Sequence, residues 1–273
     1  MRIGIVTNPS RDLNFETTNM ICEYLNSKGI IAVREGDTFE GCDFIFSIGG
    51  DGTLLSAVSN YRDLNIPFVG INRGSIGFLT EVEVSNCKDA IDRLISNDYR
   101  IISRVQLNVT VVNKDNETIY SDRCLNDCVI SRGAELHIAK MRLNIDNQLV
   151  EKFYGDGLIF STPTGSTAYS LAAGGPILMP EMKNIIITPI CSHALQNPCY
   201  CLGLNSNIMV QIDGDNSNLV ICPDGRDTFS VAHGDKVFIT GDEQRIQMVT
   251  FDYSEFFKTI RAKISKRGIF YEE

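Results

Sequence analysis

The fold is decided by the stretch Asp43-Phe44-Ile45-Phe46-Ser47-Ile48-Gly49-Gly50-Asp51-Gly52-Thr53. Residues 43–48 form a short apolar run that predicts a buried strand. Residues 54–61 place apolar side chains at helical spacing, so we expect a helix directly after the glycines. A strand, a glycine turn and a helix start together form an anion site, because free backbone N–H groups converge there and the helix dipole favours negative charge. Phosphate is the usual occupant of such a site.

Asp51 stands in the middle of this loop, although a carboxylate repels phosphate. Its presence is explained if it deprotonates a hydroxyl, or if it meets a metal ion carried by the phosphates. Either role indicates phosphoryl transfer to an alcohol. Two commoner phosphate motifs are excluded, because no Lys-Ser/Thr pair follows Gly52 and the run Gly50-Asp51-Gly52-Thr53-Leu54-Leu55 lacks a final glycine. The structural alternative is a strand-to-helix turn that needs glycine, with Asp51 near the N-cap.

The first hundred residues alternate between strand and helix patterns. The expected strands are Arg2–Thr7, Ile30–Arg34, Phe44–Ile48 and Phe68–Ile71. The expected helices are Phe15–Ser27, Thr53–Tyr61 and Asn86–Ser96. This alternation predicts an α/β N-terminal domain with a mostly parallel sheet, whose ligands bind at the carboxyl ends of its strands.

From about Arg100 the pattern changes to alternating runs joined by turn signals, which predicts a predominantly β C-terminal domain. The expected strands there are 106–111, 140–145, 185–188, 208–212, 219–222, 236–240 and 246–250. Two helices interrupt this pattern, at Thr167–Ala173 and at Ser254–Ile264. We therefore expect domains at residues 1–100 and 101–252, followed by a C-terminal segment of residues 253–273.

Composition sets the outer limits on function. A length of 273 residues allows one large or two ordinary domains, and a net charge of −9 argues against nucleic acid as a partner. The nine cysteines lack C-x-x-C spacing, which indicates neither a disulfide framework nor a zinc cluster and favours a reducing cytoplasm. We expect no signal peptide, because the opening strand stops at Asn8-Pro9, and no apolar run approaches the roughly 20 residues of a membrane span.

Further segments resemble the NAD kinases in order and spacing. They are Asn72-Arg73-Gly74-Ser75-Ile76-Gly77-Phe78-Leu79, Asn126-Asp127, Gly155-Asp156-Gly157 and the run Thr162-Pro163-Thr164-Gly165-Ser166-Thr167-Ala168-Tyr169-Ser170-Leu171-Ala172-Ala173-Gly174-Gly175-Pro176. The resemblance extends from the first strand to about Pro223, and the part from Asp156 to Pro176 is highly specific. The glycine-rich loop alone is also similar to the loops of phosphofructokinases and diacylglycerol kinases.

The resemblance implies an enzyme that phosphorylates NAD at the adenosine ribose 2′-hydroxyl to give NADP. The implied donor is ATP or polyphosphate, with a divalent cation (Mg²⁺) carried by ATP and no metal site of the protein's own. Asp51 is implied as the general base, and the donor phosphates are implied to lie along Gly49, Gly50, Gly52 and Thr53. The implied NAD-binding residues are Asp51, Gly52, Asn126, Asp127, Lys140, Asp156, Thr167, Ala168, Tyr169, Ser170, Leu171, Ala172, Cys191 and Arg226.

The residue types suit these implied roles. The Asn126 amide both donates and accepts hydrogen bonds while Asp127 accepts them, although Asn and Asp also favour plain turns. Asp156 resembles the family's adenine-contacting aspartate, again with a tight turn as the alternative. The small hydroxyl residues of 162–169 let a ligand approach the backbone, and Tyr169 is able to stack on a base. Cys191 is expected to act through its backbone.

Two positions depart from the family pattern. Ser192 precedes His193 where the family often has proline, and Asn197 stands where arginine is common. A lone histidine followed by apolar residues is more often structural than catalytic, so His193 is not included in the expected site.

The resemblance also implies an arrangement of the domains. Residues 1–100 are expected to bind the nucleotide phosphates, and residues 101–252 to bind NAD and to form a homotetramer or homodimer. The C-terminal segment is expected to return to the first domain. Apolar runs at 185–187 and 219–221 agree with strands covered on both faces, which a single domain also achieves by itself. Two alternatives stay open: a lipid or sugar kinase with the same loop, and a non-catalytic dinucleotide sensor.

Overall fold

The computed structural model of the chain describes residues 1–74, 77–134, 137–194, 198–214, 219–251 and 256–267. The chain divides into two compact units, unit 1 with residues 1–103 and 246–273 and unit 2 with residues 104–245. Three parts of the sequence predictions lie outside the described residues. They are Ser75-Ile76 of the Asn72–Leu79 motif, Asn197, and the start of the last helix at Ser254.

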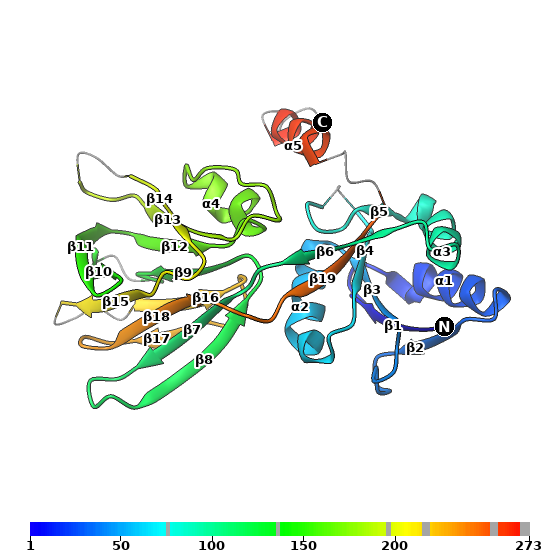
Figure 1. Cartoon of the computed structure of the whole chain (residues 1–273), viewed down its shortest axis with the longest axis horizontal. Helices are drawn as coiled ribbons and strands as arrows, with labels where there is room; N and C mark the ends of the chain where they lie inside the picture. The colour runs from blue at the N-terminus through cyan, green and yellow to red at the C-terminus, as the bar shows by residue number, and fades with distance from the viewer. Residues whose placement is uncertain (75–76, 135–136, 195–197, 215–218, 252–255, 268–273) are drawn as a thin grey trace. The chain divides into compact units, whose positions relative to one another are not determined.

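Unit 1 is built on one sheet with the strand order β2-β1-β3-β4-β19-β6, and β5 pairs with β4 (Figure 1). Its strands are β1 (Arg2–Thr7), β2 (Ile31–Arg34), β3 (Phe44–Gly49), β4 (Phe68–Asn72), β5 (Val82–Glu83), β6 (Arg100–Arg104) and β19 (Ile246–Thr250). The pairs β1–β2, β1–β3, β3–β4, β4–β5 and β4–β19 are all parallel. The expected α/β domain with a mostly parallel sheet is confirmed.

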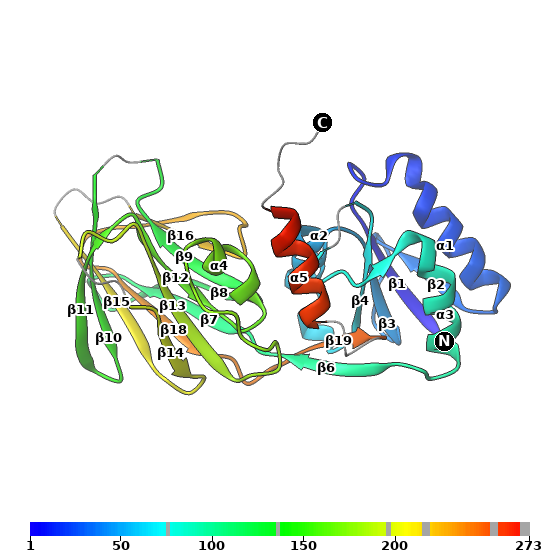
Figure 2. The same cartoon turned by 90° about the horizontal axis from the view of Figure 1, so that it is seen from above.

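Helices cover both faces of this sheet (Figure 2). They are α1 (Glu16–Ser27), α2 (Asp51–Tyr61) and α3 (Cys87–Ile95), with short 3₁₀ turns η1 (Leu13–Phe15), η2 (Arg62–Leu64) and η3 (Val84–Asn86). A further helix, α5 (Phe256–Arg267), comes after β19 in the chain. Helices α1 and α3 share one apolar core with alternate residues of β1, β3 and β4. This alternation follows from the two-residue period of a strand. None of the described helices has the length and apolar character needed to cross a membrane.

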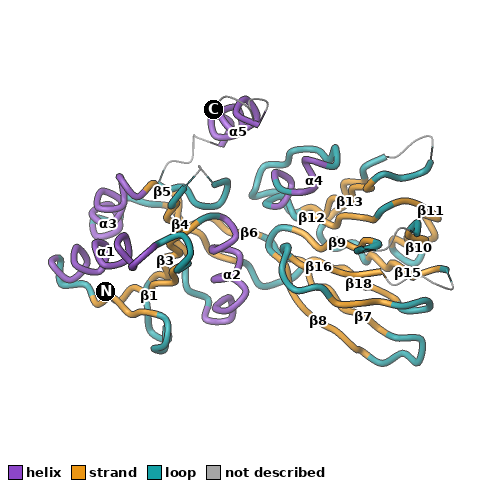
Figure 3. Tube along the Cα trace, turned by 180° about the vertical axis from the view of Figure 1, so that it is seen from behind, coloured by secondary structure: helices purple, strands orange, loops and turns teal. Residues whose placement is uncertain are grey.

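Unit 2 is a sandwich of two six-stranded sheets, with strand orders β11-β10-β15-β18-β7-β8 and β14-β13-β12-β9-β16-β17 (Figure 3). The first sheet comprises β7 (Leu107–Val112), β8 (Thr118–Cys124), β10 (Ala139–Ile145), β11 (Gln148–Gly155), β15 (Ile208–Asp213) and β18 (Lys236–Gly241). The second comprises β9 (Asp127–Ser131), β12 (Gly157–Ser161), β13 (Asn184–Ile190), β14 (Tyr200–Gly203), β16 (Leu219–Pro223) and β17 (Phe229–Val231).

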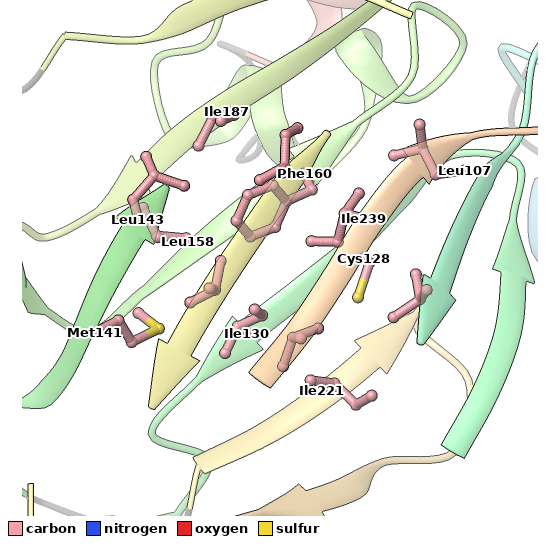
Figure 4. Packing of buried hydrophobic residues seen from close by; sticks show 14 of the residues in the cluster. Leu107, Cys128, Ile130, Met141, Leu143, Leu158, Phe160, Ile187, Ile221 and Ile239 are labelled. Carbon is pink, nitrogen blue, oxygen red and sulfur yellow. The ribbon is translucent and has the colours of Figure 1, made fainter. Parts of the chain in front are cut away.

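The core of unit 2 lies between its two sheets. Inward-facing residues of both sheets, such as Leu143 and Ile239 on one and Phe160 and Ile187 on the other, form a single buried cluster (Figure 4). A 3₁₀ turn η4 (Gly165–Thr167) and the short helix α4 (Tyr169–Ala172) follow β12. The strand pairs among the described residues of this unit are all antiparallel, which confirms the expected β-rich domain.

Two expected boundaries differ from the structure. Residues 246–250 were assigned to the β-rich domain, but they form β19, which pairs in parallel with β4 of unit 1 through Met248 and Phe68. The strand expected at residues 246–250 is confirmed as β19. Apolar periodicity predicts that a segment forms a strand, but it does not predict which strand it pairs with. The helix expected at Thr167–Ala173 is also shorter, and is divided between η4 and α4.

Asp12, in the connection between β1 and α1, fixes the loops at the carboxyl edge of the unit 1 sheet. Its fully buried carboxylate accepts hydrogen bonds from the N–H groups of Thr17 (3.0 Å) and Thr18 (2.9 Å) and from the Thr18 hydroxyl (2.6 Å). It also pairs with Arg73 Nη1 at 2.6 Å. Burial raises the pKa of Asp12, but these hydrogen bonds and the Arg73 charge outweigh burial, so its pKa lies below the ordinary value.

Replacing Asp12 with alanine is expected to lower the free energy of unfolding by roughly 2–4 kcal/mol, because it removes the buried ion pair with Arg73 and leaves the first turn of α1 without its acceptor. Because folding lowers the pKa of Asp12, the stabilisation is fully present above the pKa of Asp in the unfolded chain and is lost as pH falls from there through the lower pKa of the folded state. Urea denaturation at neutral and acidic pH measures both effects. Glu16→Gln is the control: the exposed Glu16 also faces Arg73, at 3.7 Å, and should change stability by less than about 0.5 kcal/mol. Equal losses for the two variants would contradict the assignment.

Candidate functional site

The glycine-rich loop lies at the carboxyl end of β3 in unit 1. Helix α2 begins at Asp51 with Gly50 as its N-cap, and no side chain caps it. The first N–H groups of a helix have no acceptor within the helix. A Cβ on Gly50 or Gly52 would meet nothing within 4 Å in the described part of the chain. The helix therefore presents open backbone donors to an approaching anion.

The Asp51 carboxylate is held by the segment that follows β4. Its Oδ2 accepts a hydrogen bond from the Phe78 N–H (2.6 Å), and its Oδ1 accepts from the Leu79 N–H (3.0 Å). The Thr80 N–H and hydroxyl also donate to Oδ1, each at 3.1 Å. A Cβ on Gly77 would collide with Oδ1, so only glycine fits there. A carboxylate has about four acceptor positions, and the described residues use one of those on Oδ2. Asp51 is thus oriented while Oδ2 can accept one more hydrogen bond.

The ends of three neighbouring strands meet beside this loop. Asn8, after β1, donates through Nδ2 to the Thr53 hydroxyl at 3.3 Å. Arg73, after β4, donates its backbone N–H to the Gly49 carbonyl at 2.7 Å, and its guanidinium binds Asp12. The carboxyl ends of parallel strands are where open α/β sheets bind their ligands. Gly49, Gly50, Asp51, Gly52 and Thr53 therefore share one edge.

In unit 2, Asn126 and Asp127 lie where β8 turns into β9. Asn126 Oδ1 is buried and has no hydrogen-bond partner among the described residues, and the same holds for Thr164 Oγ1. Asp127 is 5% exposed. Burial, and next the negative charge of Asp224, raise the pKa of Asp127 to about 7. A carboxyl with this pKa exists near neutral pH both as a hydrogen-bond donor and as an acceptor.

The hydroxyl-rich run that follows β12 is mostly bonded within the chain. Ser166 donates to the Pro163 carbonyl (2.6 Å), Thr167 donates to the Thr164 carbonyl (3.3 Å), and Ser170 bonds with Thr188 (2.8 Å). Most of these hydroxyls are therefore structural. The exposed ring of Tyr169 (47%) and the partly or fully exposed side chains of Ala168, Leu171 and Ala172 are the surfaces that this run offers to a ligand.

A different group of expected residues lies at the opposite end of β12. Asp156 precedes this strand and pairs with Arg132 Nε at 2.7 Å, while its N–H donates to the Ile190 carbonyl at 3.0 Å. Cys191 follows β13 in the left-handed conformation (φ 44°), and its carbonyl crowds Gly155. Lys140 is exposed on β10 of the other sheet, where it is paired with Tyr154 of β11. At about 3.3 Å per residue, Asp156 lies roughly 20 Å from Thr162 along the strand.

Arg226 is engaged within unit 2. Its Nη2 donates to Asp122 Oδ2 at 2.8 Å and to the Arg123 carbonyl at 2.9 Å. The guanidinium of Arg226 therefore stabilises the end of β8. Reaching a ligand would require Arg226 to give up these contacts.

Three residues of these sites were not expected from the sequence: Thr80 beside Asp51, Arg132 beside Asp156, and Asp224 beside Asp127. Only Asp224 carries a local signal, because Pro223-Asp224-Gly225 is a turn pattern. That pattern says nothing about which distant segment the carboxylate reaches. Among the described residues, no three His, Cys, Asp or Glu side chains are grouped to hold a metal ion.

The chain matches two family models over most of its length. Residues 32–99 match the ATP-NAD kinase N-terminal domain, and residues 125–251 match the ATP-NAD kinase C-terminal domain. The fold is similar to that of a yeast NADH kinase complexed with NADH, with a TM-score of 0.88 at 22% identity over 100% of this chain and 89% of that one. It is also similar to an NAD kinase from Archaeoglobus fulgidus in complex with ATP, with a TM-score of 0.79 at 22% identity over 97% of this chain and 99% of that one.

Curated relatives extend this similarity to the sequence. An NAD kinase from Caldanaerobacter subterraneus subsp. tengcongensis is 32% identical over 282 residues, covering 97% of this chain and 99% of the relative. An NAD kinase from Syntrophobacter fumaroxidans is 36% identical over 243 residues, covering 89% of this chain and 86% of the relative. With both family models matched and the relatives covered almost end to end, the chain belongs to the NAD kinase family.

Proposed function

We propose that the chain transfers the γ-phosphoryl group of ATP to the 2′-hydroxyl of the adenosine ribose of NAD, with Asp51 as the general base. As a member of its family the chain is an NAD kinase. The observation that carries the proposed mechanism is the oriented Asp51 carboxylate at the open N-terminus of α2, where phosphate and a hydroxyl can meet. The related structures contain ATP in one case and NADH in the other, which supports the two ligand classes.

The proposed reaction needs one group that accepts the proton of the 2′-hydroxyl. The 2′-oxygen forms a bond to the γ-phosphorus as the bond from that phosphorus to the ADP oxygen breaks. The hydroxyl proton passes to Asp51 Oδ2, which retains acceptor capacity. The products are NADP and ADP. As in other phosphoryl transfers, most of the acceleration is expected from positioning and charge stabilisation rather than from the base.

Backbone donors are proposed to hold the donor phosphates along Gly49, Gly50, Gly52 and Thr53. We assign the divalent cation, Mg²⁺, to the substrate, as the complex with ATP. The same row of donors suits polyphosphate, which we propose as a second donor. The nine cysteines are free, in agreement with the cytoplasmic location that we propose.

Asn126 and Asp127 are proposed to bind the dinucleotide. The unpartnered Asn126 Oδ1 is a buried acceptor that a ligand hydroxyl or amide can satisfy. The exposed ring of Tyr169 offers a stacking surface for a base. Asp156, Lys140 and Cys191 lie at the other end of β12, so we propose that they serve the site of a second copy of the chain in a homodimer or homotetramer.

Asp51→Asn is expected to lower turnover roughly 10²-fold or more while NAD still binds, because the amide cannot take up the proton. The variant also loses part of the hydrogen bonding to residues 78–80. Thr80→Val is therefore the matched control, since it removes one donor to Asp51 and keeps the carboxylate. We expect Thr80→Val to retain turnover within about tenfold of wild type. Steady-state NADP formation measures both variants, and similar losses in the two would mean that Asp51 acts only as a structural residue.

Asp156→Ala is expected to weaken NAD binding by about 1–3 kcal/mol through lost hydrogen bonds, with a smaller effect on ATP. Asp98→Ala is the control, because Asp98 forms a similar ion pair with Arg93 Nε at 2.8 Å in unit 1. Calorimetric titration with each ligand separates the two variants. Equal weakening of NAD and ATP binding by Asp156→Ala, or equal effects of the two substitutions, would argue against a ligand contact.

Dissociation into monomers is expected to abolish activity, because the NAD site of each copy then lacks the Asp156 that a second copy of the chain is proposed to contribute. Light scattering during size exclusion gives the assembly, and activity measured across a dilution series shows whether it follows the assembled fraction. A monomer that is fully active at working concentration would rule out the shared site.

A further inference from the structure

The backbone of residues 125–127 is held by a carboxylate that lies 97 to 99 residues further along the chain. Asp224 Oδ2 accepts a hydrogen bond from the Leu125 N–H at 2.8 Å. Its Oδ1 accepts from the N–H groups of Asn126 (2.7 Å) and Asp127 (3.2 Å). The Asp224 N–H in turn donates to the Asp127 carbonyl at 2.8 Å. One side chain therefore satisfies three successive backbone donors.

The carbonyl groups of the same segment are fixed from the opposite direction. The Thr162 hydroxyl donates to the Leu125 carbonyl at 2.6 Å, and the Thr162 N–H donates to the Asn126 carbonyl at 2.8 Å. The backbone is thus bonded on both sides, whereas Asn126 Oδ1 is buried with no partner among the described residues. An unpartnered buried acceptor costs free energy, which is recovered when a ligand supplies a donor.

Turn geometry alone does not require an aspartate at position 224. The residue follows β16 with φ 52°, and Gly225 continues the turn with φ 65°. Asparagine or glycine would suit this left-handed backbone equally well. Neither offers two charged oxygens to three N–H donors. The carboxylate also lies next to Asp127, where a second negative charge is unfavourable, so the presence of an aspartate at position 224 needs another reason.

Electrostatics couples the two carboxyl groups. The pKa of Asp127 is raised to about 7 by burial and by Asp224, and burial also raises the pKa of Asp224 although its three N–H donors and Arg226 oppose the rise. Arg226 in turn pairs with Asp122. Burial raises the pKa of three neighbouring thiols, which are neutral near pH 7: Cys124, Cys128 and Cys222. With a pKa of about 7, Asp127 titrates near neutrality.

We propose that Asp224 is a positioning residue for dinucleotide binding, and that its carboxylate fixes the backbone from which Asn126 and Asp127 meet the ligand. The inference rests on the proposed function, in which these two residues contact NAD. Asp224 itself need not touch the ligand. Its effect is to prevent the segment from moving and to set the charge of Asp127.

The test compares Asp224→Asn with Asp146→Asn. Asp146 is also an aspartate at positive φ (49°), and its Oδ1 accepts the Asn207 N–H at 2.9 Å, but it lies in the exposed β10–β11 turn. Asparagine keeps both turns and removes the charge. Asp224→Asn is expected to raise the Kd for NAD about tenfold or more and to change the Kd for ATP less than about twofold. Asp146→Asn is expected to change neither.

The pH dependence of the Kd for NAD distinguishes a positioning role from a purely structural one, because a purely structural role of Asp224 would leave that dependence unchanged. In wild type, the Kd for NAD should vary with pH with a midpoint near the Asp127 pKa of about 7. Removing the Asp224 charge should move this midpoint to lower pH, since a repulsive neighbour is lost. The variation should vanish in Asp127→Asn, which lacks the titrating group.

The outcomes separate this inference from the proposed function. If wild type binds NAD and Asp224→Asn binds it equally well with an unmoved midpoint, Asp224 is not a positioning residue. Equal losses for NAD and ATP would likewise overturn the inference in favour of a general structural role. If wild type itself neither binds nor phosphorylates NAD, the proposed function fails, and this inference fails with it.

Discussion

Hydrogen bonds from backbone N–H groups to the carboxylates of three aspartates hold the loops of both units. Asp12 binds the first turn of α1, Asp51 binds residues 78–80, and Asp224 binds residues 125–127. In each case one carboxylate satisfies two or three N–H groups that no helix or sheet ladder would satisfy. Buried loops need such partners, because an unpaired backbone donor is costly. The irregular segments that carry the expected ligand residues can therefore be ordered without regular secondary structure.

The carboxylates of unit 1 and unit 2 differ in the charges around them, and these charges determine the protonation state of each carboxylate. Asp12 is buried but has Arg73 as a cationic partner, so its pKa falls and it stays charged. Asp127 is buried next to the carboxylate of Asp224, and burial together with that negative charge raises the pKa of Asp127 to about 7. The first arrangement gives a fixed structural ion pair. The second gives a group whose charge responds to pH and to a ligand, which agrees with its place in the proposed dinucleotide site.

Local patterns predicted the elements well but not their partners. Strand β1 and helix α1 follow from apolar periodicity, and the glycine loop between β3 and α2 was placed correctly. The strand β11 was not expected, because most of its residues are exposed and show no apolar alternation. The partner of β19 and the reach of Asp224 are non-local, because each joins segments far apart in the sequence. Hydrogen bonds across such distances leave no periodic signal in a single sequence.

The glycine-rich loop shows how the structure separates two interpretations that the sequence left open. If these glycines were needed for a left-handed backbone, they would have positive φ. None of Gly49, Gly50 and Gly52 has positive φ. Gly49 is needed for space, because a Cβ there would collide with the Thr53 side chain. Gly50 and Gly52 meet no such obstacle among the described residues. Within α2, glycine costs about 1 kcal/mol relative to alanine, so Gly52 lowers stability without relieving strain or crowding. What the missing side chains leave is open space over the helix N-terminus beside Asp51. A bound phosphate chain would use that space, because it must approach the backbone donors directly.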